Sequence, residues 1–377
     1  MPIPPDRARD KTLFTPGPLT TSRTVKQAML RDLGSRDFAF IELVRDARAR
    51  LLALAGVSQA TGYEAVLVQG SGTFGVEAVL GSCVPRTGKL LVIANGAYGE
   101  RMLAMAAVLG IPTRALRYAE DALPVVADVE RALAEEDAVT TVAVVHCETT
   151  TGIVNPIAAI GAAVRRAGKT FCVDAMSSFG AIPLDLAGGT IDFLMTSANK
   201  CLEGTPGVAI VLARRTALEA ADAARSLSLD LRAQWRGLEA NGQFRFTPPT
   251  HVILGLAQAL DELEAEGGVC GRAERYRTNH AHLVAGMRGL GFREYLRPED
   301  QGYIITSFRY PADPHFSFEP FYDGLNRRDL VIYPGKVSQA DCFRIGTIGR
   351  IFPADIDVLL AMIRETLIEM GVALPLG

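Results

Sequence analysis

A single lysine, Lys200, follows an apolar run at 191–195 that is predicted to form a buried strand. Small polar residues at 196–199 precede the lysine, and a Gly-Thr-Pro-Gly turn at 204–207 follows it. Lysines normally lie on solvated surfaces, because burying an ammonium group is costly. A lysine held at a strand end beside glycines is placed for chemistry, since its amine can lose a proton and form a Schiff base with a carbonyl. On this stretch alone, a solvated loop lysine is an equally good interpretation.

A carboxylate, Asp174, directly follows another apolar strand predicted at 170–173. A buried carboxylate requires a partner. If a planar heterocycle lies in the cleft, Asp174 is placed to meet a ring nitrogen and keep it protonated.

The hexapeptide 70–75, GSGTFG, follows a predicted strand and opens a predicted helix. It matches the dinucleotide-binding pattern G-x-G-x-x-G, which would make the protein an NAD-dependent oxidoreductase. That pattern also requires an acidic residue at the end of the next strand, and the chain has Ala-Asn-Gly at 94–96. Glycines before a helix N-terminus, with the Ser71 and Thr73 hydroxyls, also form a phosphate cradle. A simple strand-to-helix turn capped by Thr73 competes with both interpretations.

Two further strand ends carry candidate ligand contacts. Tyr98 lies between glycines and can stack on a planar ligand, although a lone aromatic more often serves packing. Thr149, in the hydroxyl-rich segment 146–152, can reach a polar edge of a ligand or cap a loop. The combination of a phosphate cradle, a stacking aromatic, a carboxylate and a lysine predicts a pyridoxal phosphate site.

The order of predicted elements indicates an α/β fold. Strands expected at 65–69, 89–94, 140–145, 170–173, 191–195 and 208–212 alternate with helices and are apolar along their length. This pattern predicts a mostly parallel central sheet with helices on both faces. One helix is expected over 218–236. We divide the chain into an N-terminal arm (1–22), a large domain (23–266) and a smaller C-terminal α+β domain (267–377).

Composition excludes several function classes. The 377 residues carry a formal net charge of −3 and no basic block, so nucleic acid is not an expected partner. We expect no signal peptide and no membrane span. None of the six cysteines forms a C-x-x-C pair, which favours reduced thiols in a cytoplasmic protein, and no ligand cluster predicts a metal site.

Eight stretches in order along the chain resemble the class V, fold-type I aminotransferase family. They are LFTPGPLTTS (13–22), VLVQGSGTFGVEAVLGS (66–82), NGAYGERM (95–102), HCETTTGIVNPI (146–157), FCVDAMSSFG (171–180), TSANKCLEGTPGVAIV (196–211), RFTPPTH (245–251) and VIYPGKVSQADCFRIGTIG (331–349). The resemblance spans nearly the whole chain.

The resemblance implies roles for individual residues. Lys200 would form the Schiff base with pyridoxal 5'-phosphate, and Asp174 would pair with its pyridine nitrogen. The remaining cofactor-binding positions are Ser71, Gly72 and Thr73 at the phosphate, Tyr98 stacked on the ring, Thr149 near the ring hydroxyl, and Met176 and Asn199 in the pocket wall. Thr247 would reach the cofactor phosphate of a partner subunit, which implies a homodimer with shared active sites.

The resemblance also implies an activity. Arg344, in FRIG, and Gly17 would bind the substrate; an arginine fork suits the oxygens of a carboxylate or phosphonate. The expected reaction moves the amino group of 2-aminoethylphosphonate to pyruvate, in phosphonate catabolism. The alternatives are another class V aminotransferase using serine or alanine with glyoxylate, and a non-catalytic pyridoxal-phosphate-binding protein. A salt bridge is the competing interpretation of Arg344, and Arg23 and Arg36 are candidates for a second phosphonate contact.

Overall fold

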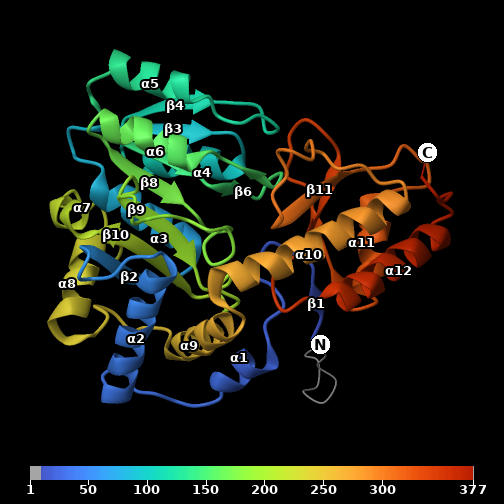
Figure 1. The fold of residues 1–377 in the computed structure, drawn as a ribbon, viewed down its shortest axis with the longest axis horizontal. Coiled ribbons are helices and arrows are strands. Elements are labelled where there is room, and N and C mark those ends of the chain that lie inside the picture. The colour runs from blue at the N-terminus through green and yellow to red at the C-terminus, as the bar shows by residue number, and fades with distance from the viewer. Residues whose placement is uncertain (1–9, 377) are drawn as a thin grey trace.

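A seven-stranded sheet forms the centre of the larger part of the molecule (Figure 1). The computed structural model describes residues 10–376, so residues 1–9 of the predicted arm lie outside the described part. The strand order is β2 (Tyr63–Gln69), β10 (Val208–Arg214), β9 (Phe193–Ser197), β8 (Thr170–Asp174), β5 (Val139–Val145), β3 (Lys89–Ala94) and β4 (Thr113–Arg117). All neighbours pair in parallel except β10, which is antiparallel to both β2 and β9. The prediction of a mostly parallel sheet is confirmed.

The sheet is covered on both faces. Successive side chains of a strand point to opposite faces, yet every residue of β9 is buried, as is all of β8 after its first residue. Helix α3 packs against β9 and β10, α4 against β3 and β5, and α6 against β8. The helices of this part are α1 (Arg23–Ala28), α2 (Phe38–Leu54), α3 (Gly72–Cys83), α4 (Ala97–Val108), α5 (Val126–Glu135), α6 (Ile157–Arg166), α7 (Arg215–Ala220), α8 (Leu231–Asn241) and α9 (Thr250–Ala265). A short hairpin of β6 (Cys147–Glu148) and β7 (Ile153–Val154) follows β5.

The single helix expected over 218–236 is wrong, because α7 ends at Ala220 and α8 begins at Leu231. The intervening segment is bound to the end of α3, where the Arg225 guanidinium donates to the Gly81 and Val84 carbonyls. Asp230 then caps the new helix by accepting a hydrogen bond from the Ala233 amide at 2.9 Å.

A second, smaller core lies beyond α9. Three antiparallel strands, β11 (Ile305–Arg309), β14 (Cys342–Gly346) and β13 (Tyr333–Pro334), pack with helices α10 (Gly268–Gly289), α11 (Phe318–Asn326) and α12 (Pro353–Glu369). Strand β1 (Thr12–Leu13) pairs in parallel with β12 (Leu330–Val331), and Phe14 is buried in this core. The described part of the arm therefore packs with the C-terminal region. Gly267, between α9 and α10, is where we predict the domain boundary, and that division stays a prediction.

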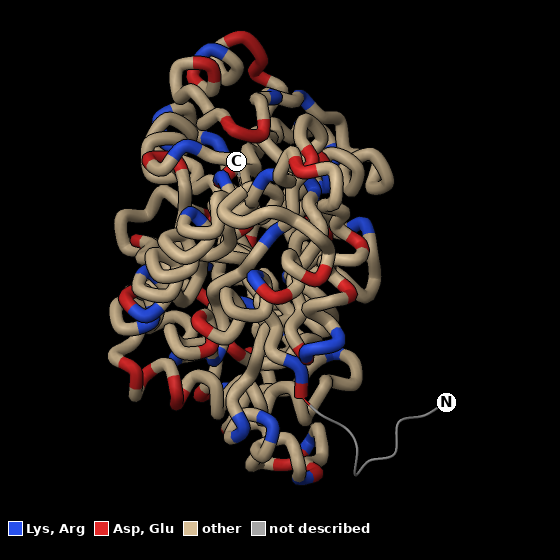
Figure 2. Tube along the Cα trace, turned by 90° about the vertical axis from the view of Figure 1, so that its right-hand side faces the viewer, with Lys and Arg blue, Asp and Glu red and all other residues tan. Residues whose placement is uncertain are grey.

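Charged side chains of both signs are interspersed along the trace (Figure 2), in keeping with the net charge of −3. Within residues 10–376, no helix has the length and apolar character needed to cross a membrane.

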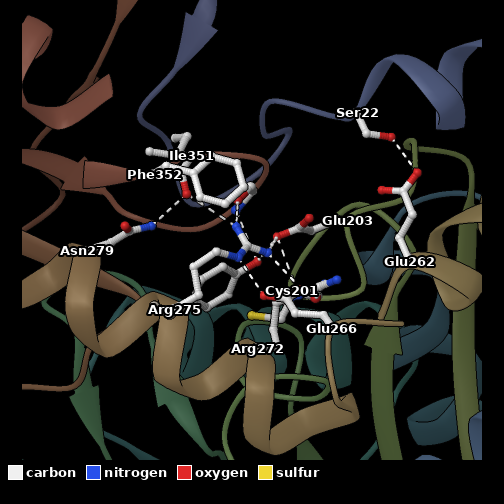
Figure 3. Close-up of polar contacts among 12 residues, drawn as sticks. Ser22, Cys201, Glu203, Glu262, Glu266, Arg272, Arg275, Asn279, Ile351 and Phe352 are labelled. Atoms are coloured by element: carbon white, nitrogen blue, oxygen red, sulfur yellow. Dashed lines mark hydrogen bonds and ion pairs between the residues drawn. The ribbon is translucent and has the colours of Figure 1, made fainter. Parts of the chain in front are cut away.

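A buried ionic network joins the loop after Lys200 to helix α10 and to the C-terminal region (Figure 3). The Arg275 guanidinium donates to Glu203 Oε1 at 2.7 Å, and Arg272 donates to the Cys201 carbonyl at 2.6 Å and to Glu266 at 2.6 Å. Burial by itself lowers the pKa of Arg275, but Glu266 and Glu203 outweigh it and raise that pKa. The Tyr276 hydroxyl donates to Glu203 Oε1 and accepts from the Gly349 amide at 3.0 Å, so the network reaches the segment after β14.

Removing one charge from this network should destabilise the fold strongly. Arg272→Ala leaves the carboxylate of Glu203 buried with less compensation, so we expect the free energy of unfolding to fall by about 3–5 kcal/mol in denaturant titrations. Arg45→Ala is the matched control, because Arg45 and its ion-pair partner Glu42 are 62% and 65% exposed, and its effect should stay below about 1 kcal/mol. Equal effects of the two substitutions would contradict a structural role for the network.

Candidate active site

One cavity opens at the carboxyl edge of the sheet, where β2, β3, β5, β8 and β9 end. Ten of the residues singled out from the sequence line it, namely Gly17, Ser71, Gly72, Thr73, Tyr98, Thr149, Asp174, Met176, Asn199 and Lys200. The sheet topology accounts for the gathering, because parallel strands bring their carboxyl ends to the same edge. The cavity wall also includes Arg101 and Ser197, which the sequence analysis did not select.

The Lys200 amine lies against the N-terminal arm. Its Nζ donates to the Pro16 carbonyl at 2.6 Å. Burial lowers the pKa of Lys200, although the nearby Tyr98 and Asp174 oppose the shift. The neutral amine, which is the nucleophilic and basic form, is therefore more accessible than in an exposed lysine.

Gly17 makes room for this lysine. A Cβ atom at Gly17 would lie 2.6 Å from Lys200 Cδ and 2.7 Å from the Asn199 carbonyl oxygen. The backbone of Gly17 also has a φ of +106°, a conformation that side-chain-bearing residues rarely adopt. Only glycine allows the arm to approach the lysine this closely.

Asp174 ends β8 on the floor of the cavity. Its Oδ1 accepts a hydrogen bond from the Met176 amide at 2.9 Å. Burial raises the pKa of Asp174 to about 6, and the Met176 amide, Lys200 and Arg101 only partly offset that effect. A carboxylate in this setting lacks a close cationic donor, and a protonated ring nitrogen would supply one.

The start of α3 forms an anion cradle. Ser71 is the N-cap of this twelve-residue helix but makes no side-chain capping bond, so its hydroxyl is free for a ligand. Among the described residues, the buried Ser197 hydroxyl has no hydrogen-bond partner. Arg101 places its guanidinium 4.7 Å from the Tyr98 ring centroid and 3.5 Å from Thr73 Oγ1. Helix N–H groups, hydroxyls and a guanidinium together fit a phosphate group.

Arg344 is not among the residues that line the cavity, but it is a buried cation bound to Thr149, which does line it. Its Nη1 donates to the Thr149 carbonyl at 2.7 Å and its Nε to the Pro334 carbonyl at 3.0 Å. It is only 2% exposed, and it forms no ion pair with any carboxylate among residues 10–376. The competing interpretation of a salt bridge therefore finds no partner in the described chain. A buried guanidinium without a counter-charge favours an anionic ligand.

Glu148 lies behind the cavity wall, where it binds the start of α4. The sequence analysis did not select this residue. Its carboxylate accepts from the Tyr98 amide at 3.2 Å and from the Thr150 hydroxyl at 2.7 Å, which fixes the start of α4. Burial raises the pKa of Glu148 to about 7. A Cβ at Gly96 would lie 2.3 Å from Glu148 Cγ, so the glycine is needed for this contact. The available signal was a glutamate three residues after an apolar strand.

Thr247 does not line the cavity of its own chain. It is exposed, and the Gln69 side chain donates to the neighbouring Phe246 carbonyl at 2.9 Å. Thr247 and Arg36 lie around a separate surface hollow, also lined by Phe246. The expected role of Thr247 in a partner's site stays a prediction.

A buried lysine, a carboxylate at the end of the neighbouring parallel strand and a phosphate cradle on an α/β sheet define a pyridoxal-phosphate-dependent enzyme of fold type I. Comparisons with known proteins agree. The chain is 52% identical over 363 residues to 2-aminoethylphosphonate–pyruvate transaminase from Salmonella schwarzengrund (strain CVM19633), covering 96% of this chain and 98% of that protein. It is equally similar, 52% over 362 residues, to the transaminase of the same name from Syntrophobacter fumaroxidans, covering 95% of this chain and 97% of that one.

Solved structures share the fold. An alanine–glyoxylate aminotransferase from Nostoc sp. superposes with a TM-score of 0.89 at 22% identity, covering 97% of this chain and 98% of that one. A pyridoxamine–pyruvate aminotransferase from Mesorhizobium loti gives 0.88 at 24% identity, covering 98% and 95%. The family profile for aminotransferase class-V matches residues 21–315. The chain belongs to the class V aminotransferases, and the predicted dependence on pyridoxal phosphate is confirmed.

The buried charge of Asp174 should cost stability when no cofactor is present. Its pKa in the fold, about 6, lies above the ordinary value of 3.8, so the folded state binds more protons in this window and stability falls as pH rises through it. Asp174→Asn should therefore stabilise the cofactor-free protein at pH 8, by about 3 kcal/mol at most. The gain should vanish as pH falls from 6 to 4.

Calorimetry of the cofactor-free protein measures this difference as a shift in Tm. Asp222→Asn, at an exposed position, changes the net charge equally and should show no such pH-dependent gain. A cofactor-free Asp174→Asn variant with an unchanged or lower Tm at pH 8 would show that the buried charge of Asp174 does not destabilise the cofactor-free fold.

Proposed function

We propose that the protein transfers the amino group of 2-aminoethylphosphonate to pyruvate, giving phosphonoacetaldehyde and L-alanine. The relatives of that name match nearly the full chain at 52% identity. The structural observation that carries the proposal is Arg344, a buried guanidinium without a carboxylate partner in the described chain, which donates to the carbonyl of Thr149 in the wall of the Lys200 cavity. Both substrates carry an anionic group for it to bind.

The residues of the cavity fit the cofactor of this family. Pyridoxal phosphate, when bound, supplies an electrophilic carbonyl and a ring that accepts electrons from a substrate carbon. Ser71, Thr73 and the N–H groups at the start of α3 would hold its phosphate. Asp174 would face its ring nitrogen and keep that nitrogen protonated, because the buried carboxylate needs a cationic donor.

Lys200 would move the proton. Its buried amine has a lowered pKa, so it can accept a proton from the substrate carbon without first losing one to bulk water. The arm holds the amine through the Pro16 carbonyl, which also keeps solvent from that side of the side chain. Proton transfer in the reverse direction serves the pyruvate half of the reaction.

Arg344 would orient both substrates. Its guanidinium is fixed by the Thr149 and Pro334 carbonyls, so little conformational freedom is lost when an anion binds. An arginine fork donates to two oxygens of a phosphonate or of a carboxylate in the same geometry. One residue can therefore serve both half-reactions.

A steady-state comparison of amino donors tests the proposal. With pyruvate as acceptor, 2-aminoethylphosphonate should give a kcat/KM at least roughly tenfold above those of L-serine and L-alanine, since one added charged contact is sufficient for that ratio. Turnover with L-serine and glyoxylate that equals or exceeds it would favour the alternative, a serine or alanine–glyoxylate aminotransferase.

We also infer a homodimer in which Thr247 contacts the partner's cofactor phosphate. Thr247 is exposed and absent from its own cavity wall, while the side chain of the adjacent Phe246 is 45% exposed. Exposed phenylalanines beside a binding site are typical of an interface.

A cytoplasmic location is a further proposal. It is supported by six cysteines that form no disulfide, and activity in a periplasmic fraction would contradict it.

Subunit mixing tests the shared site. Lys200→Ala should abolish turnover, and Thr247→Ala should weaken cofactor binding roughly tenfold. If Thr247 acts across the interface, refolding the two variants together should restore about a quarter of the sites to wild type, since each mixed dimer holds one intact site. Activity that merely sums the two variants would place Thr247 in its own subunit's site. Mixing Lys200→Ala with wild type is the control.

A further inference from the structure

A loop at 335–341 connects β13 to β14, and its exposed Lys336 lies over the ring of Tyr98, a residue of the cavity wall. The Gly335 amide donates to the Cys342 carbonyl at 2.9 Å. The Arg344 guanidinium donates to the carbonyl of Pro334, just before the loop. On its other side, Ser338 is fixed to Glu120 by its amide at 2.8 Å and its hydroxyl at 3.1 Å. The loop therefore bridges the substrate arginine and the segment after β4.

Lys336, in this loop, points its amine at the face of Tyr98. Its Nζ lies 5.1 Å from the Tyr98 ring centroid. Within the described chain Lys336 forms no ion pair and no hydrogen bond to a carboxylate. Burial would raise the pKa of Tyr98, but the Thr149 side chain together with Lys200, Lys336 and Arg344 outweighs it and lowers that pKa. Three cations from different segments, Lys200, Lys336 and Arg344, therefore lie close enough to Tyr98 to lower its pKa.

The proposed substrates differ in charge. A carboxylate has two oxygens and carries one negative charge, whereas a phosphonate has three oxygens and can carry two negative charges. Arg344 alone balances the carboxylate of pyruvate or alanine. When a phosphonate dianion binds Arg344, one of its two negative charges stays unbalanced, and its third oxygen is free to accept from a second cation.

We propose that Lys336 is the second phosphonate contact and the residue that makes the site prefer a phosphonate dianion over a carboxylate. This inference rests on the proposed function. The amine has no competing carboxylate, and its loop is attached to Arg344, so both cations can reach one anion beside Tyr98.

The other candidate cations are less well placed. Arg36 lies around a separate hollow with Thr247, and Arg23 begins α1. Arg101 lies beside Thr73 at the cradle, where the cofactor phosphate would neutralise it. Lys336 lies in the loop that leads directly into β14, the strand of Arg344.

The test compares two ligands of matched size on the holoenzyme, ethylphosphonate and propionate, by calorimetry. In parallel, single-turnover half-reactions use 2-aminoethylphosphonate or L-alanine as amino donor. The variants are Lys336→Met, Lys336→Arg as the charge-preserving change, and Lys169→Met. Lys169 is a matched control, because it lies before β8, at the opposite end of that strand from Asp174.

Lys336→Met should weaken ethylphosphonate binding and raise the half-saturating concentration of 2-aminoethylphosphonate roughly ten- to hundredfold. Propionate and L-alanine should change by less than about twofold, and Lys336→Arg should retain most of the phosphonate affinity. Equal loss for both anions, or no loss for either, would overturn the proposal. A wild-type enzyme inactive with 2-aminoethylphosphonate would instead refute the proposed function, and the contrast between ethylphosphonate and propionate would still decide the role of Lys336.

Discussion

The close approach of the N-terminal arm to Lys200 is the constraint on which the site depends. The amine is held by the Pro16 carbonyl, and the arm comes this near only because residue 17 has no side chain. The arm is in turn fixed to the C-terminal region, where the Gly346 amide donates to the Phe14 carbonyl at 3.0 Å. Lys200 follows β9 of the large sheet and Arg344 belongs to β14, so the arm links the lysine to the strand that carries Arg344.

The cavity and its surroundings hold more cationic than anionic side chains. Lys200 and Arg101 share the cavity wall with one carboxylate, Asp174, whose charged form burial disfavours. Arg344 is buried beside the cavity and has no carboxylate partner in the described chain. An excess of buried positive charge is unfavourable unless anions enter. A cofactor phosphate at the α3 cradle and a substrate anion at Arg344 would each neutralise part of that excess. The same electrostatic imbalance would thus favour both cofactor binding and substrate binding.

The sequence was most informative where chemistry follows a strand. Asp174, Lys200 and Thr73 could be placed at one edge because apolar strands in a parallel sheet end together, and the sheet is as predicted. Contacts between distant segments left no local signal. Arg344 donates to the carbonyl of a residue 195 positions away, and Glu148 accepts from a backbone amide of α4. The Ser197 hydroxyl lay in a run of small polar residues that did not distinguish it. The break between α7 and α8 was missed for the same reason, because carbonyls of α3 and of the residue that follows it bind Arg225.

The central claim is that this cavity exchanges an amino group between 2-aminoethylphosphonate and pyruvate. The most direct measurement is the visible absorbance of the purified holoenzyme in a single half-reaction. Adding 2-aminoethylphosphonate without pyruvate should abolish the visible band of the bound cofactor and release phosphonoacetaldehyde in an amount equal to the sites. Adding pyruvate should then restore the band and yield L-alanine. A band unaffected by 2-aminoethylphosphonate but lost on adding L-serine would contradict the account.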